Sequence, residues 1–456
     1  MTASSRERMA GVAERGAWFA FVVLVVVSPM RARLTIDARR TATVYGDYTD
    51  FLLFVSDVAL LATVALWFVS LVGRRRAVWF GPRFVRWPVA AILIVMGVGV
   101  PFAVDVPLAA YTSVRFLVLA ALAVYVVNEV GRLSRLVAPL AVMVVVQAVI
   151  GIGQVVGQRS VGVGWLGEHV LAPSLGVSVV TANDGVRTLR AYGLTDHPNI
   201  LGGVLAMALL LLAGVIITQG DRVNHADRST WWLTEVFALG GAALLVTFSR
   251  GAWLGLLAGL LVAAGMLMLM RDRVALRRLG SLCVAGLMVA APFALPFRHV
   301  MSVRASASRR SATEVRSVSE RVALSDATTR IVSDHPLVGV GIASLPLAMR
   351  AAQPSFAYPY QPAAVVLLDV TAELGVLGGA AYLVVVTAPW VALLRRRTRW
   401  TGELAAASAA LVALTVVGLF DYYPWTYSAG RIWTWLVLSL WLMVYRNATS
   451  RSADAV

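Results

Sequence analysis

Two arginine-bearing motifs flank long apolar segments and could bind phosphate. One reads Arg190-Ala-Tyr-Gly-Leu-Thr-Asp-His-Pro-Asn199, and the other reads Thr247-Phe-Ser-Arg-Gly251 within about forty apolar residues. Planar guanidinium groups bind phosphate oxygens through paired hydrogen bonds and stay charged at any cellular pH. Two arginines on the same membrane surface therefore favour a diphosphate ligand, held by Arg190 and Arg250.

Both motifs also have a structural interpretation. Asp196 or Thr195 could cap a helix that Pro198 opens, and the backbone N–H groups of its first turn would then attract an anion near Arg190. The same motif could equally be a loop that ends in a helix cap. Arg250 could be an interfacial anchor whose charged head reaches the lipid headgroups. The residues alone leave these alternatives open.

Two further motifs carry groups that could transfer a proton. His335 precedes Pro336 and a pair of glycines, so it is either a candidate base or only a residue at a helix end. Asp369 and Glu373 lie four residues apart and share one helical face. They could relay a proton, or they could form a satisfied pair inside a helix bundle.

An aromatic turn, Phe420-Asp-Tyr-Tyr-Pro-Trp-Thr-Tyr427, is followed by Arg431. Aromatic belts at the membrane interface account for most of that composition. The chain has no phosphate-binding glycine loop, no dinucleotide fingerprint and no His/Cys spacing typical of a metal site. Its single cysteine, Cys283, lies in an apolar run and excludes an intrachain disulfide. We therefore expect no metal and no cofactor.

The elements that position these motifs are membrane helices. Hydrophobic residues make up 59% of the chain, charged residues only 14%, and the mean hydropathy is +0.77. Apolar runs long enough to cross about 30 Å of hydrocarbon recur along the whole sequence. The predicted fold is an all-α polytopic membrane protein with about twelve transmembrane helices. The predicted spans are 15–30, 50–72, 87–104, 107–130, 136–157, 198–218, 231–249, 251–270, 279–297, 364–394, 402–420 and 430–446.

The distribution of arginines predicts the orientation of these spans. The net charge of +16 arises from arginines scattered at the ends of apolar runs, which disfavours a nucleic-acid partner. With the N-terminus inside, 22 arginines fall in inside segments and 9 in the short outside segments. The positive-inside rule therefore places both termini in the cytoplasm, with the bilayer as a permanent partner.

The spans divide the chain into three regions. Residues 1–297 are predicted to hold helices one to nine, with an outer loop at 158–197. Residues 298–363 form a large extracytoplasmic loop, and residues 364–456 hold the last three helices with a short cytoplasmic tail. Loops of that size in a compact protein are usually functional or disordered. We expect the second half of the large loop to fold over a cavity.

In this order the five motifs, covering roughly residues 185 to 435, resemble the O-antigen ligase and polymerase family. The resemblance implies a GT-C-like glycosyltransferase of the inner membrane. Such an enzyme transfers a glycan from undecaprenyl diphosphate to an acceptor glycan or glycolipid, without metal or nucleotide. It also implies that Arg190 and Arg250 hold the lipid diphosphate. Further matching or supporting positions are Tyr192, Gly193, His197, Pro198, Asn199, Ser249, Arg321, His335, Pro336, Gly339, Gly341, Asp421 and Arg431.

One departure from the family pattern concerns the general base. The family usually has Gln-Pro-x-His-Asn before a Glu-Leu-Gly, and here the histidine and asparagine positions are Ala364 and Val365. Tyr422 likewise stands where the family often has histidine. The chain is then a slow or inactive relative, uses another base such as His335 or Asp369, or takes a different acceptor. The competing hypotheses are a non-catalytic glycolipid-binding partner in polysaccharide assembly and, third, a transporter.

Overall fold

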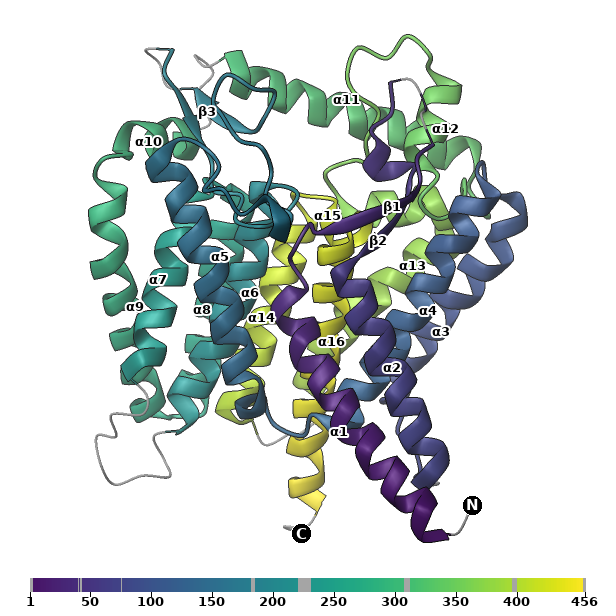
Figure 1. Cartoon of the computed structure of the whole chain (residues 1–456), viewed down its shortest axis with the longest axis vertical. Helices are drawn as coiled ribbons and strands as arrows, with labels where there is room; N and C mark the ends of the chain where they lie inside the picture. Colours follow the sequence, from purple (N-terminus) through teal and green to yellow (C-terminus); the bar gives the residue numbers. More distant parts are fainter. Residues whose placement is uncertain are drawn as a thin grey trace.

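The computed structural model describes residues 3–39, 41, 43–74, 76–181, 185–219, 231–306, 312–395 and 400–453. They form a bundle of long helices, and the N- and C-terminal ends lie at the same end of it (Figure 1). Some arginines used for the orientation prediction lie outside these residues, namely Arg40, Arg75, Arg222, Arg228, Arg396, Arg397 and Arg399.

The predicted spans are confirmed as helices, with ends shifted by a few residues or, at a few ends, by more. They are α1 (Ala3–Val27), α2 (Val55–Arg74), α3 (Arg83–Gly99), α4 (Val106–Glu129), α5 (Val137–Gly157), α6 (Pro198–Gln219), α7 (Trp231–Val246), α8 (Arg250–Leu269), α9 (Arg273–Ala294), α13 (Val366–Arg395), α14 (Gly402–Gly418) and α16 (Ser428–Ala453). Within the described residues, nine helices are long and apolar enough to span a membrane, and α7 and α14 are shorter apolar helices. The turn expected near Ser249 separates α7 from α8.

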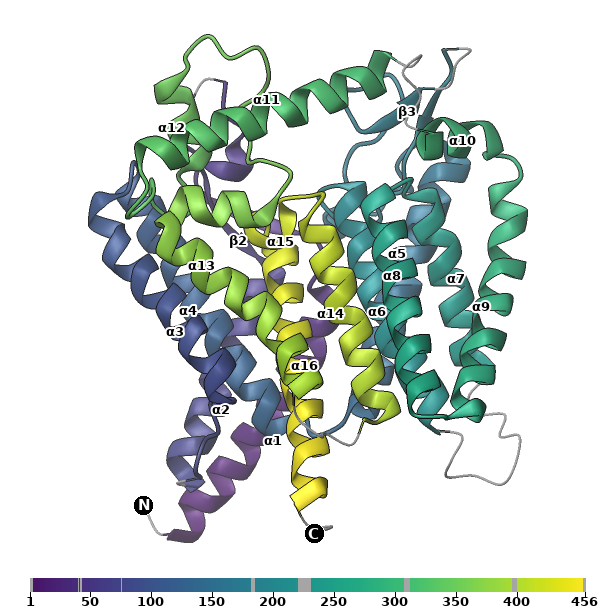
Figure 2. The same ribbon diagram turned by 180° about the vertical axis from the view of Figure 1, so that it is seen from behind.

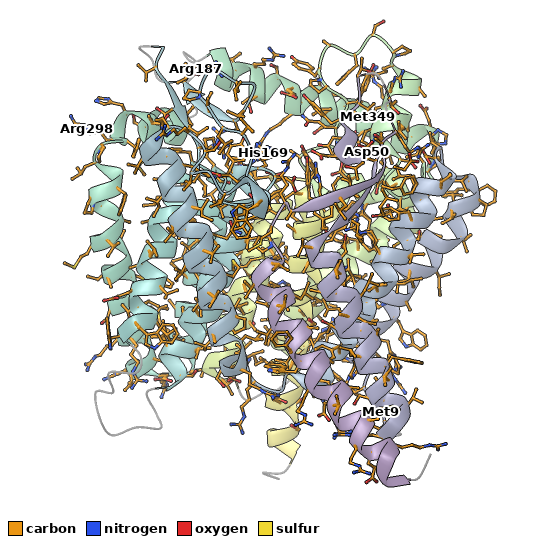
Figure 3. The ribbon with its side chains drawn as sticks, viewed as in Figure 1. Met9, Asp50, His169, Arg187, Arg298 and Met349 are labelled. Atoms are coloured by element: carbon orange, nitrogen blue, oxygen red, sulfur yellow. The ribbon has the colours of Figure 1, made fainter. Side chains whose placement is uncertain are left out.

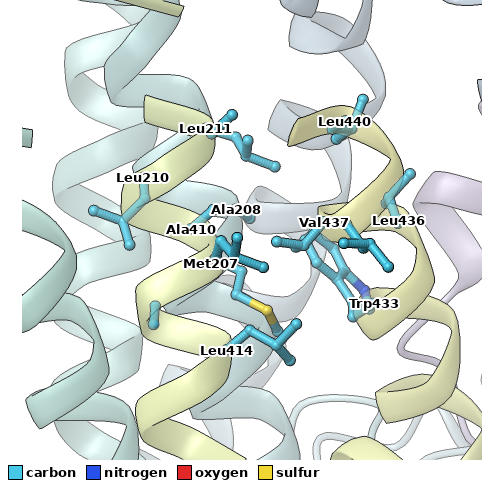
Figure 4. Packing of buried hydrophobic residues seen from close by; sticks show 14 of the residues in the cluster. Met207, Ala208, Leu210, Leu211, Ala410, Leu414, Trp433, Leu436, Val437 and Leu440 are labelled. Atoms are coloured by element: carbon cyan, nitrogen blue, oxygen red, sulfur yellow. The ribbon is translucent and has the colours of Figure 1, made fainter. Parts of the chain in front are cut away.

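Helix α6 lies at the centre of the bundle because it is apolar on all sides. Of its most apolar 18-residue stretch, 94% is buried. Figure 4 shows Met207 and Leu211 of α6 packed with Trp433 and other residues of α14 and α16. A Cβ atom on Gly214 would lie 2.0 Å from the Ala406 Cβ, so glycine allows α6 and α14 to approach closely, as small residues do in membranes.

Four further helices and two hairpins cover the end of the bundle opposite the termini. The helices are α10 (Arg298–Ser306), α11 (Ala312–Asp334), α12 (Leu345–Ala352) and α15 (Tyr423–Thr426). The antiparallel hairpins pair β1 (Arg33–Asp37) with β2 (Phe51–Phe54), and β3 (Val179–Thr181) with β4 (Arg187–Leu189). Figure 2 shows α11 lying across this end. Asp50, His169 and Met349 lie at this end and Met9 at the other (Figure 3), and we call it the outer end.

Helix α13 is broken at Gly375, where φ is 71° and ψ is −179°. The segment 336–341 runs beside the break, and the Val340 N–H donates to the Ala372 carbonyl at 2.9 Å. Two similar bonds of 2.9 Å join Gly341 to Glu373 and Val376 to Pro336. A break in a membrane helix is tolerated only when other groups satisfy the freed backbone. The loop segment with Gly339 and Gly341 therefore belongs structurally to α13.

Candidate functional site

Arg190 joins the two arginine-bearing motifs. Its side chain is 3% exposed, and its Nε donates to the Thr247 carbonyl at 2.7 Å. Its Nη1 donates to Ser178 Oγ at 2.8 Å, and its Nη2 donates to Asn199 Oδ1 at 2.5 Å. The buried guanidinium thus fixes the turn that precedes Arg250. The segments of Arg190 and Arg250 meet at one end of the bundle.

Asp421 connects these motifs to the aromatic turn. Asn199 Nδ2 donates to Asp421 Oδ2 at 2.6 Å. Next to Asp421, the Phe420 carbonyl accepts from Arg321 Nη1 of α11 at 3.2 Å. A Cβ atom on Gly251 would lie 3.6 Å from the Phe420 Cβ, so the first turn of α8 packs on the same residue. The turn between α14 and α15 therefore lies between Arg250 and Arg321.

A chain of hydrogen bonds extends from the aromatic turn to the large loop. The Tyr422 hydroxyl donates to Gln361 Oε1 at 3.1 Å, and Gln361 Nε2 donates to Glu320 Oε1 of α11 at 2.7 Å. The Tyr422 and Tyr48 hydroxyls are 2.9 Å apart. We call the connected set the outer cluster. It consists of Arg190, Asn199, Arg250, Arg321, Asp421, Tyr422, Gln361, Glu320 and Tyr48.

Burial changes the acidity of the carboxyl groups in the outer cluster. It raises the pKa of Asp421 above the ordinary value, and the nearby Arg321 guanidinium partly opposes that rise. Burial also raises the pKa of Glu320, against Arg316 and Arg321. A carboxylate with a raised pKa is a better proton acceptor near neutral pH. The outer cluster thus combines cations that suit an anionic group with carboxylates that suit a proton.

A comparison with known protein families finds a match for one part of the chain. Residues 236–383, about a third of the chain, match the family model described as O-antigen ligase. This chain carries an O-antigen ligase domain. No curated protein matches the chain. The domain and the helix bundle together indicate a membrane glycan ligase or polymerase.

The O-antigen ligase domain supplies only part of the outer cluster. It includes Arg250, Glu320, Arg321 and Gln361. The remaining members come from segments outside the match, namely Tyr48, Arg190, Asn199, Asp421 and Tyr422. Hydrogen bonds between Arg190 and Thr247 and between Tyr422 and Gln361 join the two groups. The site is therefore a property of the whole bundle.

His335 is not brought to the outer cluster. It follows α11 directly and is exposed. Arg321 lies fourteen positions earlier, which corresponds to about 20 Å along a helix. The backbone of His335 accepts from the Gly339 N–H at 3.1 Å at the start of the segment that packs on α13. The structure therefore places His335 at a helix end, and not beside Arg321.

Asp369 and Glu373 are both buried, at 1% and 4% exposure, in the first part of α13. Asp369 Oδ1 accepts from the Ala363 N–H at 2.8 Å, two residues after Gln361. Glu373 Oε2 accepts from Trp425 Nε1 at 2.7 Å. No hydrogen bond within the described residues joins the two carboxyls. Asp369 thus holds the backbone next to Gln361 of the outer cluster, and Glu373 holds the Trp425 side chain of α15.

The other supporting residues lie around Arg190 and below the aromatic turn. The Tyr192 hydroxyl accepts from the Ser178 N–H at 2.7 Å, and its ring meets the His197 ring edge-on at 6.1 Å. Ser249 is buried at the N-cap of α8 without a side-chain capping bond. Arg431 donates to the Trp425 carbonyl at 2.6 Å. These residues position the cluster and its neighbours.

The predicted cap of α6 takes a different form. Asp196 accepts from Arg31 Nε and Arg33 Nη1, each at 3.0 Å, instead of capping the helix. Thr195 donates to backbone carbonyls, and His197 Nδ1 accepts from the Asn199 N–H at 3.2 Å. The carboxylate of Asp196 is drawn away by two guanidinium groups, which bind it more strongly than a neutral N–H does.

Sequence reasoning missed several polar residues near the site. Arg31 and Arg33 bind Asp196 from the first hairpin, and Asp47 pairs with Arg33. Below them Arg115 Nη2 donates to both oxygens of Asp57, at 2.7 and 2.8 Å. The sequence held one signal for the pair of Asp57 and Arg115. An acidic residue such as Asp57, near the start of an apolar span, needs a cationic partner. In the described part of the chain no three His, Cys, Asp or Glu side chains group as a metal site.

Proposed function

We propose that this protein is a membrane glycosyltransferase of the outer face of the plasma membrane. It transfers a glycan from undecaprenyl diphosphate to a hydroxyl of an acceptor glycan or glycolipid. The observation that carries the proposal is the convergence of arginine-bearing segments on Asp421 at one end of the bundle. A diphosphate leaving group needs cations beside it, and an attacking hydroxyl needs a proton acceptor.

The arginines divide into binding and positioning roles. Arg250 and Arg321 flank Phe420 and bind the diphosphate, stabilising the charge that develops as it leaves. Each nitrogen of the Arg190 guanidinium already donates to a protein acceptor. Arg190 therefore contributes to diphosphate binding mainly by holding the Thr247 turn that presents Arg250.

Asp421 is the proposed general base, in place of the histidine that is Ala364 here. The acceptor hydroxyl oxygen forms a bond to the anomeric carbon, and its proton moves to the Asp421 carboxylate. The bond from the anomeric carbon to the phosphate oxygen breaks, and undecaprenyl diphosphate leaves with the electron pair. Burial, which raises the pKa of Asp421, supports this role.

The first experiment measures transfer from a lipid-linked oligosaccharide by the purified chain in lipid vesicles. Arg250→Ala and Arg321→Ala should each lower turnover roughly 10²- to 10³-fold, because each removes one electrostatic contact to the leaving group. Arg330→Ala is the matched control, since this arginine is exposed on the far part of α11. Normal turnover in both test variants would contradict the proposed diphosphate site.

The second candidate function is glycolipid binding without transfer, as an assembly partner. The observation that favours it is Ala364 at the position of the expected histidine. In this case the native chain binds the lipid-linked oligosaccharide in vesicles but forms no product. An Ala364→His variant that gains transfer would support this second function.

A further inference from the structure

An apolar cavity lies towards the end of the bundle opposite to the outer cluster. It has a volume of about 330 Å³ and lies between α3, α4 and α16. Its walls are almost entirely apolar, and they include Phe80, Val89, Leu93, Ala120, Ala123 and Leu438. Ligand cavities in proteins start at about this volume. A cavity of this kind at membrane depth accommodates a hydrocarbon chain.

One residue that lines this cavity, Arg86, has no acidic partner among the described residues. Arg86 lines the cavity, and its Nε is buried with no hydrogen-bond partner among the described residues. None of the ion pairs found in those residues includes Arg86. Its guanidinium instead lies over the Trp87 ring, 5.0 Å from the centroid. A buried N–H donor beside an apolar cavity requires an acceptor, because leaving it unpaired costs about 1–3 kcal/mol.

A second arginine, Arg446, and the loop that carries Trp79 lie beside the cavity. The Arg446 guanidinium from the end of α16 lies 4.8 Å from the centre of the Trp79 ring, which also lines the cavity. Asn128 of α4 holds this loop, since it accepts from the Trp79 N–H at 3.0 Å and donates to the Trp79 carbonyl at 2.9 Å. The cations and the apolar walls are therefore fixed relative to each other before any ligand binds.

We propose that this cavity binds one anionic phospholipid from the leaflet next to the chain termini. An acyl chain fills the apolar cavity, and the phosphate accepts hydrogen bonds from Arg86 and pairs with Arg446. Basic pockets between membrane helices suit anionic headgroups for this reason. A phosphate oxygen then supplies the acceptor that the Arg86 Nε does not find among the described residues.

The position of the cavity separates this lipid from the proposed lipid-diphosphate substrate. Arg86 and Gly99 are thirteen residues apart on α3, about 20 Å along the helix. Gly99 packs against Val338 at the outer end, so Arg86 lies towards the other membrane surface. The phospholipid site does not rest on the proposed transfer reaction, because it uses none of the residues of the outer cluster.

The test uses the purified full chain in neutral detergent, titrated with dioleoyl phosphatidylglycerol or dioleoyl phosphatidylcholine. Native mass spectrometry measures the fraction of protein that retains one lipid. We expect preferential retention of phosphatidylglycerol, and Arg86→Gln should weaken that binding roughly fivefold. Arg277→Gln, an exposed arginine on α9, is the matched control and should bind as the native chain does.

A second variant tests the cavity without changing any charge. Ala123→Leu adds volume to the wall and should lower phosphatidylglycerol retention, while a thermal melt of each variant checks that it folds. Equal retention of the two lipids by the native chain would overturn the proposal. So would unchanged binding in Arg86→Gln, or in Ala123→Leu. Self-association that blocks lipid binding would assign the cavity to a second copy instead.

Discussion

At the scale of single residues, the outer cluster is organised around one carboxylate. Asp421 accepts from Asn199, which in turn accepts from Arg190. Asp421 lies 222 positions from Asn199, so no local pattern in the sequence shows that these two residues touch. The sequence did show that the residues were costly to place near a membrane and therefore candidates for function.

The Asp421→Asn substitution tests the proposed base. The change preserves size but removes the proton acceptor, so we expect transfer to fall roughly 10²- to 10⁴-fold. In the native chain kcat/KM should rise with pH through the raised pKa of Asp421, because only the ionised carboxylate accepts a proton. The acid limb of that pH profile should therefore lie above the ordinary range of an aspartate.

The matched control for this substitution is Asp326→Asn, an exposed aspartate on α11. It should leave both the rate and the pH profile unchanged. If Asp421→Asn retains the native rate and acid limb, Asp421 is not the base. His335→Ala provides the contrast, and since His335 lies about 20 Å along α11 from Arg321, we expect it to keep the native rate.

At the scale of elements, the membrane helices could be predicted because length and apolar composition alone define them. The hairpin of β1 and β2 could not. Its strands are short, and Val44 bridges to Tyr360, more than three hundred residues away. Likewise the glycines at 339 and 341 indicated a turn, but only the structure shows that their segment satisfies the backbone of α13. Such pairing depends on tertiary contacts and not on local periodicity.

The break in α13 predicts a strong effect of Gly375→Ala. A Cβ atom there would lie 2.2 Å from the Leu337 carbonyl oxygen, and φ is 71°. The left-handed backbone alone costs a side chain about 1–2 kcal/mol, and the clash adds to that cost. A thermal melt in detergent should show a clearly lower Tm than that of the native chain.

Gly265→Ala on α8 is the control for this substitution, because a Cβ atom there meets nothing within 4 Å. It should be neutral or slightly stabilising, since alanine favours a helix. If Gly375→Ala and Gly265→Ala have the same Tm, the contact between α13 and the loop segment 336–341 does not contribute to stability.

At the scale of the whole molecule, the positions of the chain ends agree with the predicted orientation. Both ends lie at the end of the bundle opposite to α11 and α15 (Figure 1). We propose that the termini are cytoplasmic, as the arginine distribution predicts. The phospholipid cavity then belongs to the cytoplasmic leaflet, where anionic lipids and cytoplasmic arginines meet.

Cysteine labelling tests this orientation. Cys283→Ser provides the background, and Ser134→Cys and Ser174→Cys add exposed thiols on either side of α5. A membrane-impermeant maleimide added to intact cells should label Ser174→Cys at once. It should label Ser134→Cys only after the membrane is permeabilised. The reverse pattern would invert the topology and move the outer cluster to the cytoplasm.

The hydrogen bond between Asn199 and Asp421 joins residues 222 positions apart. During synthesis, Asp421 leaves the ribosome after eleven of the twelve predicted spans have been made. Until then Asn199 has no carboxylate to donate to, and the arginine segments have no aromatic turn to pack on. A nascent or truncated chain that lacks α14 to α16 therefore has no complete reaction centre, so chemistry begins only once the last helices have inserted.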